Sequence, residues 1–313
     1  MGESKTQGSR PMTENAAHKA NIIEDAEPKG PFQEFWYYFS KNKGAVAGLV
    51  VIFAFLCIAI GAPLLTPYDP GIIHENALRT PPIWQETGSW THPLGTDDVG
   101  RDIWSRLAHG ARVSLGIGFL VVLLSASVGT ILGLLSGFYG GFIDRTIMRG
   151  VDILMSLPSI LLAIVVVSIL GPSLLNAIIA VSIVAIPNFV RLVRASAMAE
   201  KAKTYVTASR CFGASKKRLI FYHILPNCMA PLIIQATLGF SDGILNAAAL
   251  GFLGLGAQPP TPEWGTMLAD SRAYIESAPY LVTLPGLCIL FVVLGFNLLG
   301  DGMRDAFDPR LRR

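Results

Sequence analysis

Residues 44–65 read GAVAGLVVIFAFLCIAIGAPLL, an apolar run without a charged side chain. A helix rises about 1.5 Å per residue, so about 20 apolar residues can cross the hydrocarbon core of a bilayer. Inside that core every backbone polar group needs a partner within the protein, and a helix supplies one. The run therefore predicts a membrane-spanning helix, and with it an integral membrane protein.

The composition of the whole chain agrees with this prediction. Of its 313 residues, 51% are hydrophobic and 15% are charged, and the mean hydropathy is +0.49. Soluble domains usually carry about 25% charged residues, so much of this surface faces something other than water. The net charge of +3 does not indicate nucleic-acid binding. The four cysteines show neither metal-ligand nor disulfide spacing, and we interpret them as small buried hydrophobic residues. They are Cys57, Cys211, Cys228 and Cys288.

Further apolar runs bring the predicted number of transmembrane helices to six. The candidate spans are 44–65, 113–138, 151–170, 174–190, 228–255 and 280–299. The third and fourth are separated only by Gly171-Pro172-Ser173, which indicates a tight turn. The predicted fold class is an all-α integral membrane protein, whose core of spans after the first occupies residues 113–300.

Lysine and arginine near the ends of the spans predict the orientation. Basic residues concentrate in segments 1–43, 139–150, 191–227 and 300–313. The segments 66–112 and 256–279 carry few, and acidic residues largely balance them. Loops rich in Lys and Arg stay on the cytoplasmic side. Both termini are therefore predicted to be cytoplasmic, with 301–313 as a short tail, and 66–112 is predicted to be an outside loop.

The segment before the first span has a helical pattern of aromatic residues. They recur on one helical face, at Phe32, Phe35, Trp36 and Phe39. The pattern predicts a short helix over 32–43, which either lies in the lipid headgroup layer or forms an aromatic belt where the span begins. Residues 1–31 are polar and aperiodic, so we expect a disordered tail there.

A long polar segment, residues 191–227, connects the fourth and fifth spans. Connections longer than roughly 12–15 residues usually have a function. Tyr205, Ala208 and Phe212 share a helical face, and Gly213 can end that helix. Such a helix, surrounded by Arg and Lys, is suited to docking in a groove of a partner protein. Alternatively, the basic residues only fix the topology and contact anionic lipid.

This segment resembles the EAA loop of ABC importer permeases, E-A-A-x3-G-x9-I-x-L-P. Thr207-Ala208-Ser209, Gly213 and Leu225-Pro226 match that spacing. Thr207 stands in place of the glutamate and His223 in place of the isoleucine. These departures concern a specific salt bridge rather than the docking role.

Three more stretches resemble the dipeptide, oligopeptide and nickel branch of these permeases, most nearly the C subunit of dipeptide permeases. They are HPLGTDDVGRD at 92–102 with GARVSL at 110–115, GFLGLG at 251–256 with QPPTPEWG at 258–265, and LGDG at 299–302 with DPR at 308–310. The likeness runs from about Phe32 to Arg313.

The resemblance implies a type I ABC importer permease of the bacterial inner membrane. Such importers have two homologous permease subunits, two cytoplasmic ATPase subunits that bind ATP and Mg²⁺, and a periplasmic binding protein. A coupling helix within a loop at 196–227 would ride in an ATPase cleft, and it would contain Tyr205, Ala208, Ser209, Phe212 and Gly213. The chain itself would hold no cofactor and catalyse no reaction. The implied cargo is a dipeptide, with oligopeptides, nickel chelates, glutathione and haem as alternatives.

The outside loop has two possible roles. Its run Thr96-Asp97-Asp98 precedes Arg101-Asp102 and is suited to cap a short helix. These charges either contact the binding protein and guard the mouth of the pathway, or form a fold-stabilising Asp/Arg network packed on the other permease subunit.

Asp242 lies well inside a predicted span, with Asn246 one helical turn later. Carboxylates at membrane depth are costly and are candidates for function. Either Asp242 lines the pathway and meets the amino group of a peptide, or it makes a polar packing contact with the partner subunit. A helix break near Gly243 is a further interpretation.

Other functional classes fit less well. A proton-coupled secondary transporter needs several buried ionisable residues and usually has inverted repeats, whereas this sequence offers one such residue and no clear repeat. The motifs HExxH, GxSxG and GxxxxGK[ST] do not occur. The sequence thus indicates neither a zinc protease, a serine enzyme nor an ATPase.

Overall fold

A computed structural model describes residues 30–307 of the chain, and these residues form a bundle of helices. The α-helices are α2 Pro31–Lys41, α3 Lys43–Leu65, α4 Ile103–Tyr139, α5 Gly141–Met155, α6 Ser159–Leu170, α7 Leu174–Lys201, α8 Thr204–Cys211, α9 Lys216–Arg218, α10 Leu225–Phe252, α11 Trp264–Ser271 and α12 Tyr280–Phe307. A π-helical turn, η1 Leu219–Ile224, joins α9 to α10, and a 3-10 turn, η2 Arg272–Tyr274, follows α11. Most of the N-terminal tail, for which disorder is predicted, lies outside the described range. The last residues of the C-terminal tail lie outside it as well.

Five segments of the described chain are long and apolar enough to cross a membrane. They are α3, α4, α7, the continuous helix Lys216–Phe252 and α12. A sixth span exists only if α5 and α6, which meet at a bend of 93°, are counted together as one broken span. The prediction of an all-α membrane protein is confirmed. Its count of six spans holds when α5 and α6 are counted as one broken span.

The third predicted span, 151–170, is not one helix, so this part of the prediction was wrong. The chain breaks between Met155 and Ser159. Pro158 restricts the residue before it to extended conformations and has no N–H to donate. The carbonyl of Pro158 instead accepts the N–H of Leu162 at 3.0 Å and so begins α6. A proline in the apolar run therefore redirects the chain.

Several helices extend beyond the apolar runs that predicted them. Helix α4 begins at Ile103 instead of residue 113, so the outside loop is shorter than 66–112. Its N-cap is Asp102, whose carboxylate accepts the N–H of Ser105 at 2.8 Å, and not the run at 96–98. Helix α7 continues to Lys201 and α12 to Phe307. Hydropathy marks the apolar part of a helix, whereas caps and tertiary packing decide where the helix ends.

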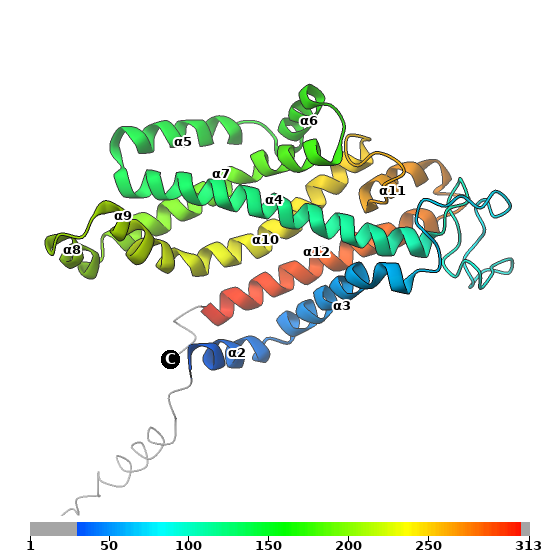
Figure 1. The fold of residues 1–313 in the computed structure, drawn as a ribbon, viewed down its shortest axis with the longest axis horizontal. Coiled ribbons are helices and arrows are strands. Elements are labelled where there is room, and N and C mark those ends of the chain that lie inside the picture. The colour runs from blue at the N-terminus through cyan, green and yellow to red at the C-terminus, as the bar shows by residue number, and fades with distance from the viewer. Residues whose placement is uncertain (1–29, 308–313) are drawn as a thin grey trace, which may run out of the picture.

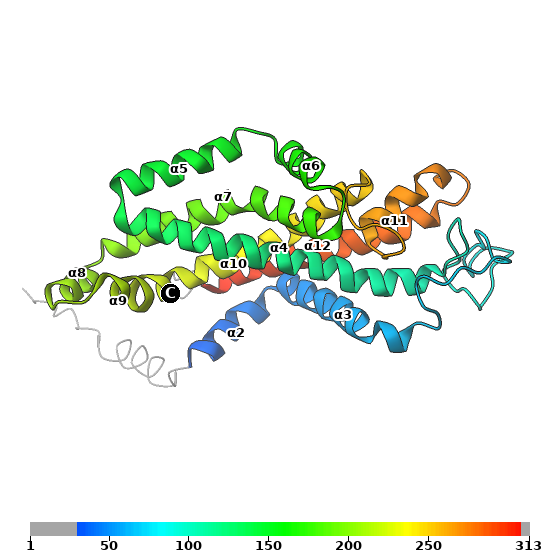
Figure 2. The ribbon, with the colours of Figure 1, turned by 45° about the horizontal axis from the view of Figure 1, so that its top comes forward.

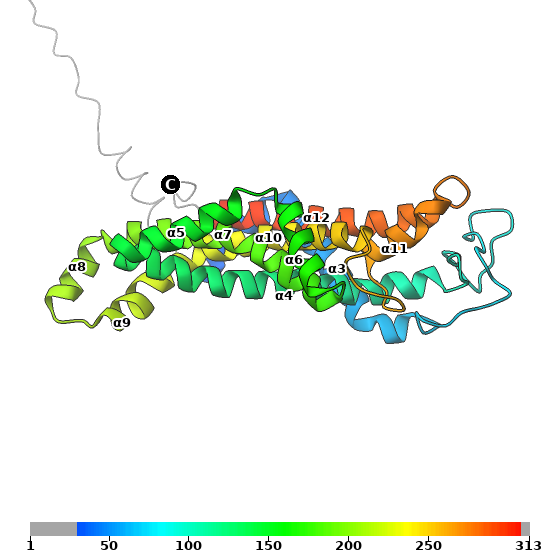
Figure 3. The same ribbon diagram turned by 90° about the horizontal axis from the view of Figure 1, so that it is seen from above.

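The helices form an elongated bundle (Figure 1). Helices α8 and α9 lie at one end, and the irregular loop 66–102 lies at the other, where α11 is also found. The start of α2 and the end of α12 both lie toward the α8 end (Figure 1). Turning the molecule shows α6 standing across the bundle (Figure 2) and α8 projecting at its tip (Figure 3). Segments predicted to be inside therefore gather at one end, opposite those predicted to be outside.

Helices α4 and α7 approach each other along a row of glycines. Gly129, Gly133 and Gly137 recur every fourth residue on α4. A Cβ at Gly133 would stand 2.8 Å from the Cβ of Val193, and one at Gly137 would stand 2.7 Å from the carbonyl of Arg194. Lipid tails provide no hydrophobic driving force between helices, so association in a membrane relies on such close packing. We call this row the glycine seam.

The predicted aromatic helix is α2, which ends at Lys41 and not at residue 43. Part of its aromatic face packs on α12, because the rings of Phe35 and Phe307 lie 4.9 Å apart and Phe39 is buried. Asn42 separates α2 from α3. Its side-chain oxygen accepts the N–H of Ala45 at 3.1 Å, and its amide donates to Asp305 at 3.0 Å.

The cysteines divide into two pairs. Cys228 is buried and Cys288 is partly buried, but Cys57 and Cys211 are exposed. The interpretation of all four as buried was therefore wrong. Cys57 lies on α3, whose apolar residues point in every direction, so an apolar surrounding in the sequence does not imply burial in the fold.

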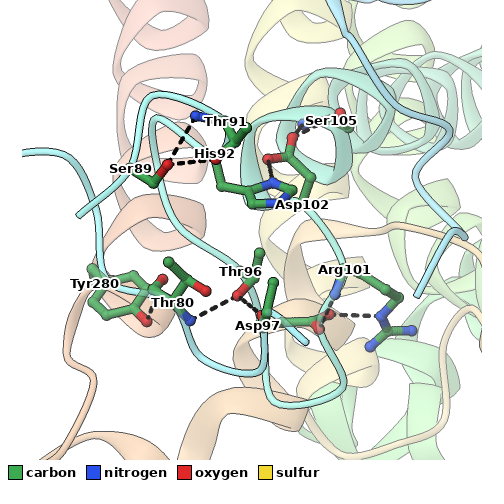
Figure 4. A network of polar contacts seen from close by, with 11 residues as sticks. Thr80, Ser89, Thr91, His92, Thr96, Asp97, Arg101, Asp102, Ser105 and Tyr280 are labelled. Carbon is green, nitrogen blue, oxygen red and sulfur yellow. Dashed lines mark hydrogen bonds and ion pairs between the residues drawn. The ribbon is translucent and has the colours of Figure 1, made fainter. Parts of the chain in front are cut away.

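Polar contacts within the chain hold the outside loop (Figure 4). The Asp97 carboxylate accepts the N–H of Arg101 at 2.8 Å and pairs with its guanidinium at 2.6 Å. Arg101 also lies 3.9 Å from Asp270 of α11, and Nδ1 of His92 lies 2.9 Å from the cap residue Asp102. The Asp/Arg network thus ties the loop to α4 and α11. Its contact with the binding protein or with another permease subunit stays a prediction.

The QPPTPEWG stretch starts α11 and fixes it against the bundle. The Glu263 carboxylate accepts the N–H groups of Gly265 and Thr266, each at 2.8 Å, and burial raises its pKa. Trp264 is fully buried, and its indole N–H donates to the carbonyl of Leu107 at 3.1 Å. A side chain at Gly265 would meet the backbone of Ala248. Each of these residues therefore has a packing or capping role.

The glycine seam yields a direct test. We expect Gly133→Ala to destabilise the protein by about 1–3 kcal/mol, because the added methyl group meets Val193 and the backbone of Val190. Gly116→Ala on the same helix is the matched control, since nothing lies within 4 Å of a Cβ there. Unfolding of the purified protein in detergent measures both variants. Equal stability of the two variants would contradict the role of the seam.

Candidate functional site

Helix α8 lies at the tip of the bundle, inside the segment that connects α7 to α10. The N–H of Phe212 donates to Ala208 at 3.0 Å, and that of Ala214 donates to Ser209 at 3.1 Å. Between them Gly213 has φ of +84°, a conformation that favours glycine. Gly213 therefore ends the helix, as its position in the sequence predicts.

A polar cluster anchors the start of α8. The hydroxyl of Tyr205 donates to the buried carboxylate of Glu200, and the amide of Asn227 donates to the same hydroxyl at 3.1 Å. The ammonium of Lys203 lies 2.6 Å from Glu200, and the carbonyl of His223 lies 3.2 Å from the Tyr205 hydroxyl. Partial burial, followed by the bond to Glu200, raises the pKa of Tyr205 to about 12. The hydroxyl therefore stays protonated and joins the end of α7 to the start of α10.

The five residues predicted for the coupling helix do not all face the same way. Tyr205 is 41% exposed, but its hydroxyl is held by Glu200 and Asn227, and the hydroxyl of Ser209 lies 3.2 Å from Nε2 of His223. Ala208 is exposed, and Phe212 is 92% exposed at the end of the helix. The structure therefore divides the set into two residues that fasten α8, two that are available to a partner, and the terminating Gly213.

Sequence reasoning missed three members of this cluster: Glu200, His223 as a hydrogen-bonding residue, and Asn227. Glu200 had a visible signal, because it is the only acidic residue in the strongly basic segment 191–227. An isolated acid among many basic residues indicates a specific internal partner, and here it has Lys203 and Tyr205. His223 shows in the sequence only as a departure from the family pattern.

Basic residues surround α8. A groove of about 530 Å³ between α8 and the end of α4 is lined by Lys201, Arg210 and Lys216 among others. Lys201 donates to the carbonyl of Phe138 at 2.5 Å, and the ammonium of Lys216 lies 5.5 Å from the ring centre of Tyr139. The tip of the bundle thus presents an exposed aromatic residue beside a cationic groove.

The second predicted site lies in a cavity of about 410 Å³ on the side of the bundle. Residues of α5, α6, α7 and α10 line it, and both Asp242 and Asn246 are among them. The amide of Asn246 donates to the backbone carbonyl of Asp242 at 2.8 Å. Helix α10 runs unbroken to Phe252, so the interpretation of a break near Gly243 was wrong. Gly243 instead allows close packing on Val121, whose side chain lies 3.1 Å from the position of a Cβ.

The described residues contain no group of three or more His, Cys, Asp or Glu placed to hold a metal ion.

Two family models match the chain. The binding-protein-dependent transport system inner membrane component matches residues 129–313, and the N-terminal TM domain of oligopeptide transport permease C matches residues 30–82. The dipeptide transport system permease protein DppC of Haemophilus influenzae is 54% identical over 286 residues, which are 91% of this chain and 97% of the relative. DppC of Escherichia coli K12 is 56% identical over 302 residues, covering 96% and 99%.

A more distant relative and a solved structure extend these comparisons. The glutathione transport system permease protein GsiD of Pectobacterium atrosepticum is 43% identical over 291 residues, covering 93% of this chain and 95% of the relative. An inward-facing structure of the MetNI methionine ABC transporter matches with a TM-score of 0.54 at 22% identity, covering 66% of this chain and 98% of that chain. That likeness concerns the fold alone. The chain belongs to the family of inner membrane components of binding-protein-dependent transport systems.

Proposed function

We propose that this chain is one of two permease subunits of an ATP-driven importer that moves dipeptides from the periplasm to the cytoplasm. The observation that carries the proposal is the 54–56% identity to two dipeptide permeases over nearly the full length of both. A relative from Pseudomonas aeruginosa, named for di- and tripeptides, is 56% identical as well. The glutathione permease stands lower, at 43%. Oligopeptides, nickel chelates, glutathione and haem remain the alternative cargoes of the same machinery.

The chain is a multi-pass protein of the inner membrane and a non-catalytic permease subunit, since ATP hydrolysis belongs to a separate subunit of such transporters. We further propose its detailed partners: a homologous second permease subunit, two ATPase subunits that bind ATP and Mg²⁺, and a periplasmic binding protein. In this assembly both ends of the chain face the cytoplasm. The clustering of α2, the end of α12 and the basic α8 segment at one end of the bundle supports that orientation.

Helix α8 has the form that a coupling helix requires. Phe212 projects from its end, and the cationic groove beside it suits an acidic rim on an ATPase. The Tyr205 cluster and the Ser209–His223 contact fasten α8 to α7 and α10 at once. A displacement of α8 by the ATPases would therefore reach both spans. ATP and the loaded binding protein must each favour the same conformation of the spans, because a ligand shifts an equilibrium only through differential affinity.

Uptake of a labelled dipeptide tests the proposed function. The complete complex is placed in vesicles with ATP inside, loaded binding protein outside and a protonophore present. We expect uptake that requires ATP and ignores the protonophore. Uptake abolished by the protonophore would contradict the ATP-driven mechanism. If ATP hydrolysis responds to loaded binding protein but no dipeptide enters, the ATP-driven importer is retained and the dipeptide is excluded as its substrate.

Docking of α8 can be tested at Phe212. We expect Phe212→Ala to weaken ATPase binding by roughly 30-fold, because truncating a buried aromatic anchor of an interface costs about 2 kcal/mol or more. Trp90→Ala is the matched control, since Trp90 is also highly exposed (83%) but belongs to loop 66–102, at the opposite end of the bundle from α8. Binding of purified ATPase subunits to the permease pair measures the effect. The docking role is excluded if the two variants bind equally well.

Cys211 reports the orientation, because it is exposed on α8. In membranes made without the ATPase subunits, we expect a membrane-impermeant maleimide to label Cys211 in inverted vesicles but not in spheroplasts. Thr87→Cys in the opposite loop, at an exposed position, should show the reverse pattern. Labelling of Cys211 from outside intact spheroplasts would reverse the proposed topology.

A further inference from the structure

We propose that the cavity between α5, α6, α7 and α10 binds the N-terminal ammonium group of a peptide in transit, with Asp242 as the counter-ion. This inference rests on the proposed function. It goes further by assigning the residues of this chain that recognise the cargo.

The first observation is a carboxylate without an internal partner. Asp242 is the only charged residue of α10. Its side chain is exposed to the cavity, and no side-chain hydrogen bond or ion pair joins it to any described residue. An unpaired charge at membrane depth is costly, so such residues face water, a cation or a polar cavity. The carboxylate of Asp242 is therefore available to bind a ligand that enters the cavity from outside the chain.

The second observation is the arrangement of side chains on the same face of α10. Gln235, Asp242 and Asn246 lie seven and four residues apart, which places them along one side of the helix. Gly239 and Gly243 also line the cavity, and the ring of Phe189 and the side chain of Val121 pack against them, at 3.3 and 3.1 Å from the position of a Cβ. The carboxylate is thus flanked by an amide group about two turns before it and another one turn after it.

Other helices complete the lining. Asn188 of α7 and Ser159 of α6 add a third amide and a hydroxyl. Amide groups both donate and accept, so they suit the N–H and C=O groups of a peptide bond. The bend between α5 and α6 adds apolar residues, among them Met155 and Leu157. A volume of about 410 Å³ lies in the range of small-molecule pockets.

The charge of the lining selects among ligands. Among the described residues, those that line the cavity include no Lys or Arg, so the lining carries one negative charge and no cation to neutralise it. One carboxylate with amides is a poor ligand set for a transition metal, which prefers several imidazole, thiolate or carboxylate ligands. A proton relay would need further titratable groups, and the lining has none. A primary ammonium group, with a peptide bond next to it, fits the donors and acceptors that are present.

The test compares Asp242→Asn and Asp242→Glu in the complete transporter, using a labelled dipeptide with a free amino terminus and saturating loaded binding protein. We expect Asp242→Asn to lower uptake per ATP hydrolysed by roughly 10-fold or more, since a charge-assisted bond is lost. The concentration of loaded binding protein that gives half-maximal ATP hydrolysis should stay unchanged, because Asp242 acts after delivery. Asp242→Glu keeps the charge and should retain most of the uptake.

Other results overturn the inference. Unchanged uptake by Asp242→Asn would show that the carboxylate does not meet the cargo. Loss of the second permease subunit from both variants on purification would assign Asp242 to subunit packing instead. Absence of dipeptide uptake by the unmodified transporter is a different failure: the proposed function then falls, and the assignment of this site falls with it.

Discussion

The fold depends on the glycine seam between α4 and α7. In lipid no hydrophobic force drives helices together, so van der Waals contact over a close backbone approach has to do so. Gly129, Gly133 and Gly137 permit that approach. Because α7 is fixed there, its other residues are placed as well: Asn188 at the cavity and Glu200 beneath α8. Both candidate sites therefore depend on one helix pair.

Much of the architecture could be predicted from hydropathy and charge, but the ends and breaks of helices could not. The run 44–65 matches α3 closely, since that helix scarcely extends beyond its apolar part. Helix α4 starts earlier than its apolar run because the Asp102 cap and the loop network extend it. Pro158 marks the break at 156–158 in the sequence, but the long apolar run around it still predicts a single span. Hydropathy shows that a segment favours an apolar environment, but it does not show where the helix axis changes direction.

The candidate sites show a similar division. The pattern of residues 205–213 was sufficient to place α8 and its end at Gly213. It was not sufficient to show that the hydroxyl of Tyr205 is held within the chain, because its partners Glu200 and Asn227 come from two other helices. Asp242 was conspicuous as a carboxylate in a span. Its cavity was not, since the walls come from segments that are far apart in the sequence and include a bend.

The π turn at η1 has a geometric consequence for the helix that contains it. Leu225 donates its N–H to Ile220, five residues back, and Pro226 follows without an N–H. The wider ring takes in one extra residue, which corresponds to about 100° of azimuth in an α-helix. Segment 216–252 is therefore one continuous helix, but the side-chain directions before and after the π turn do not follow a single α-helical repeat. The direction in which Lys216 leaves the helix axis therefore cannot be calculated from that of Asp242 by counting regular α-helical turns.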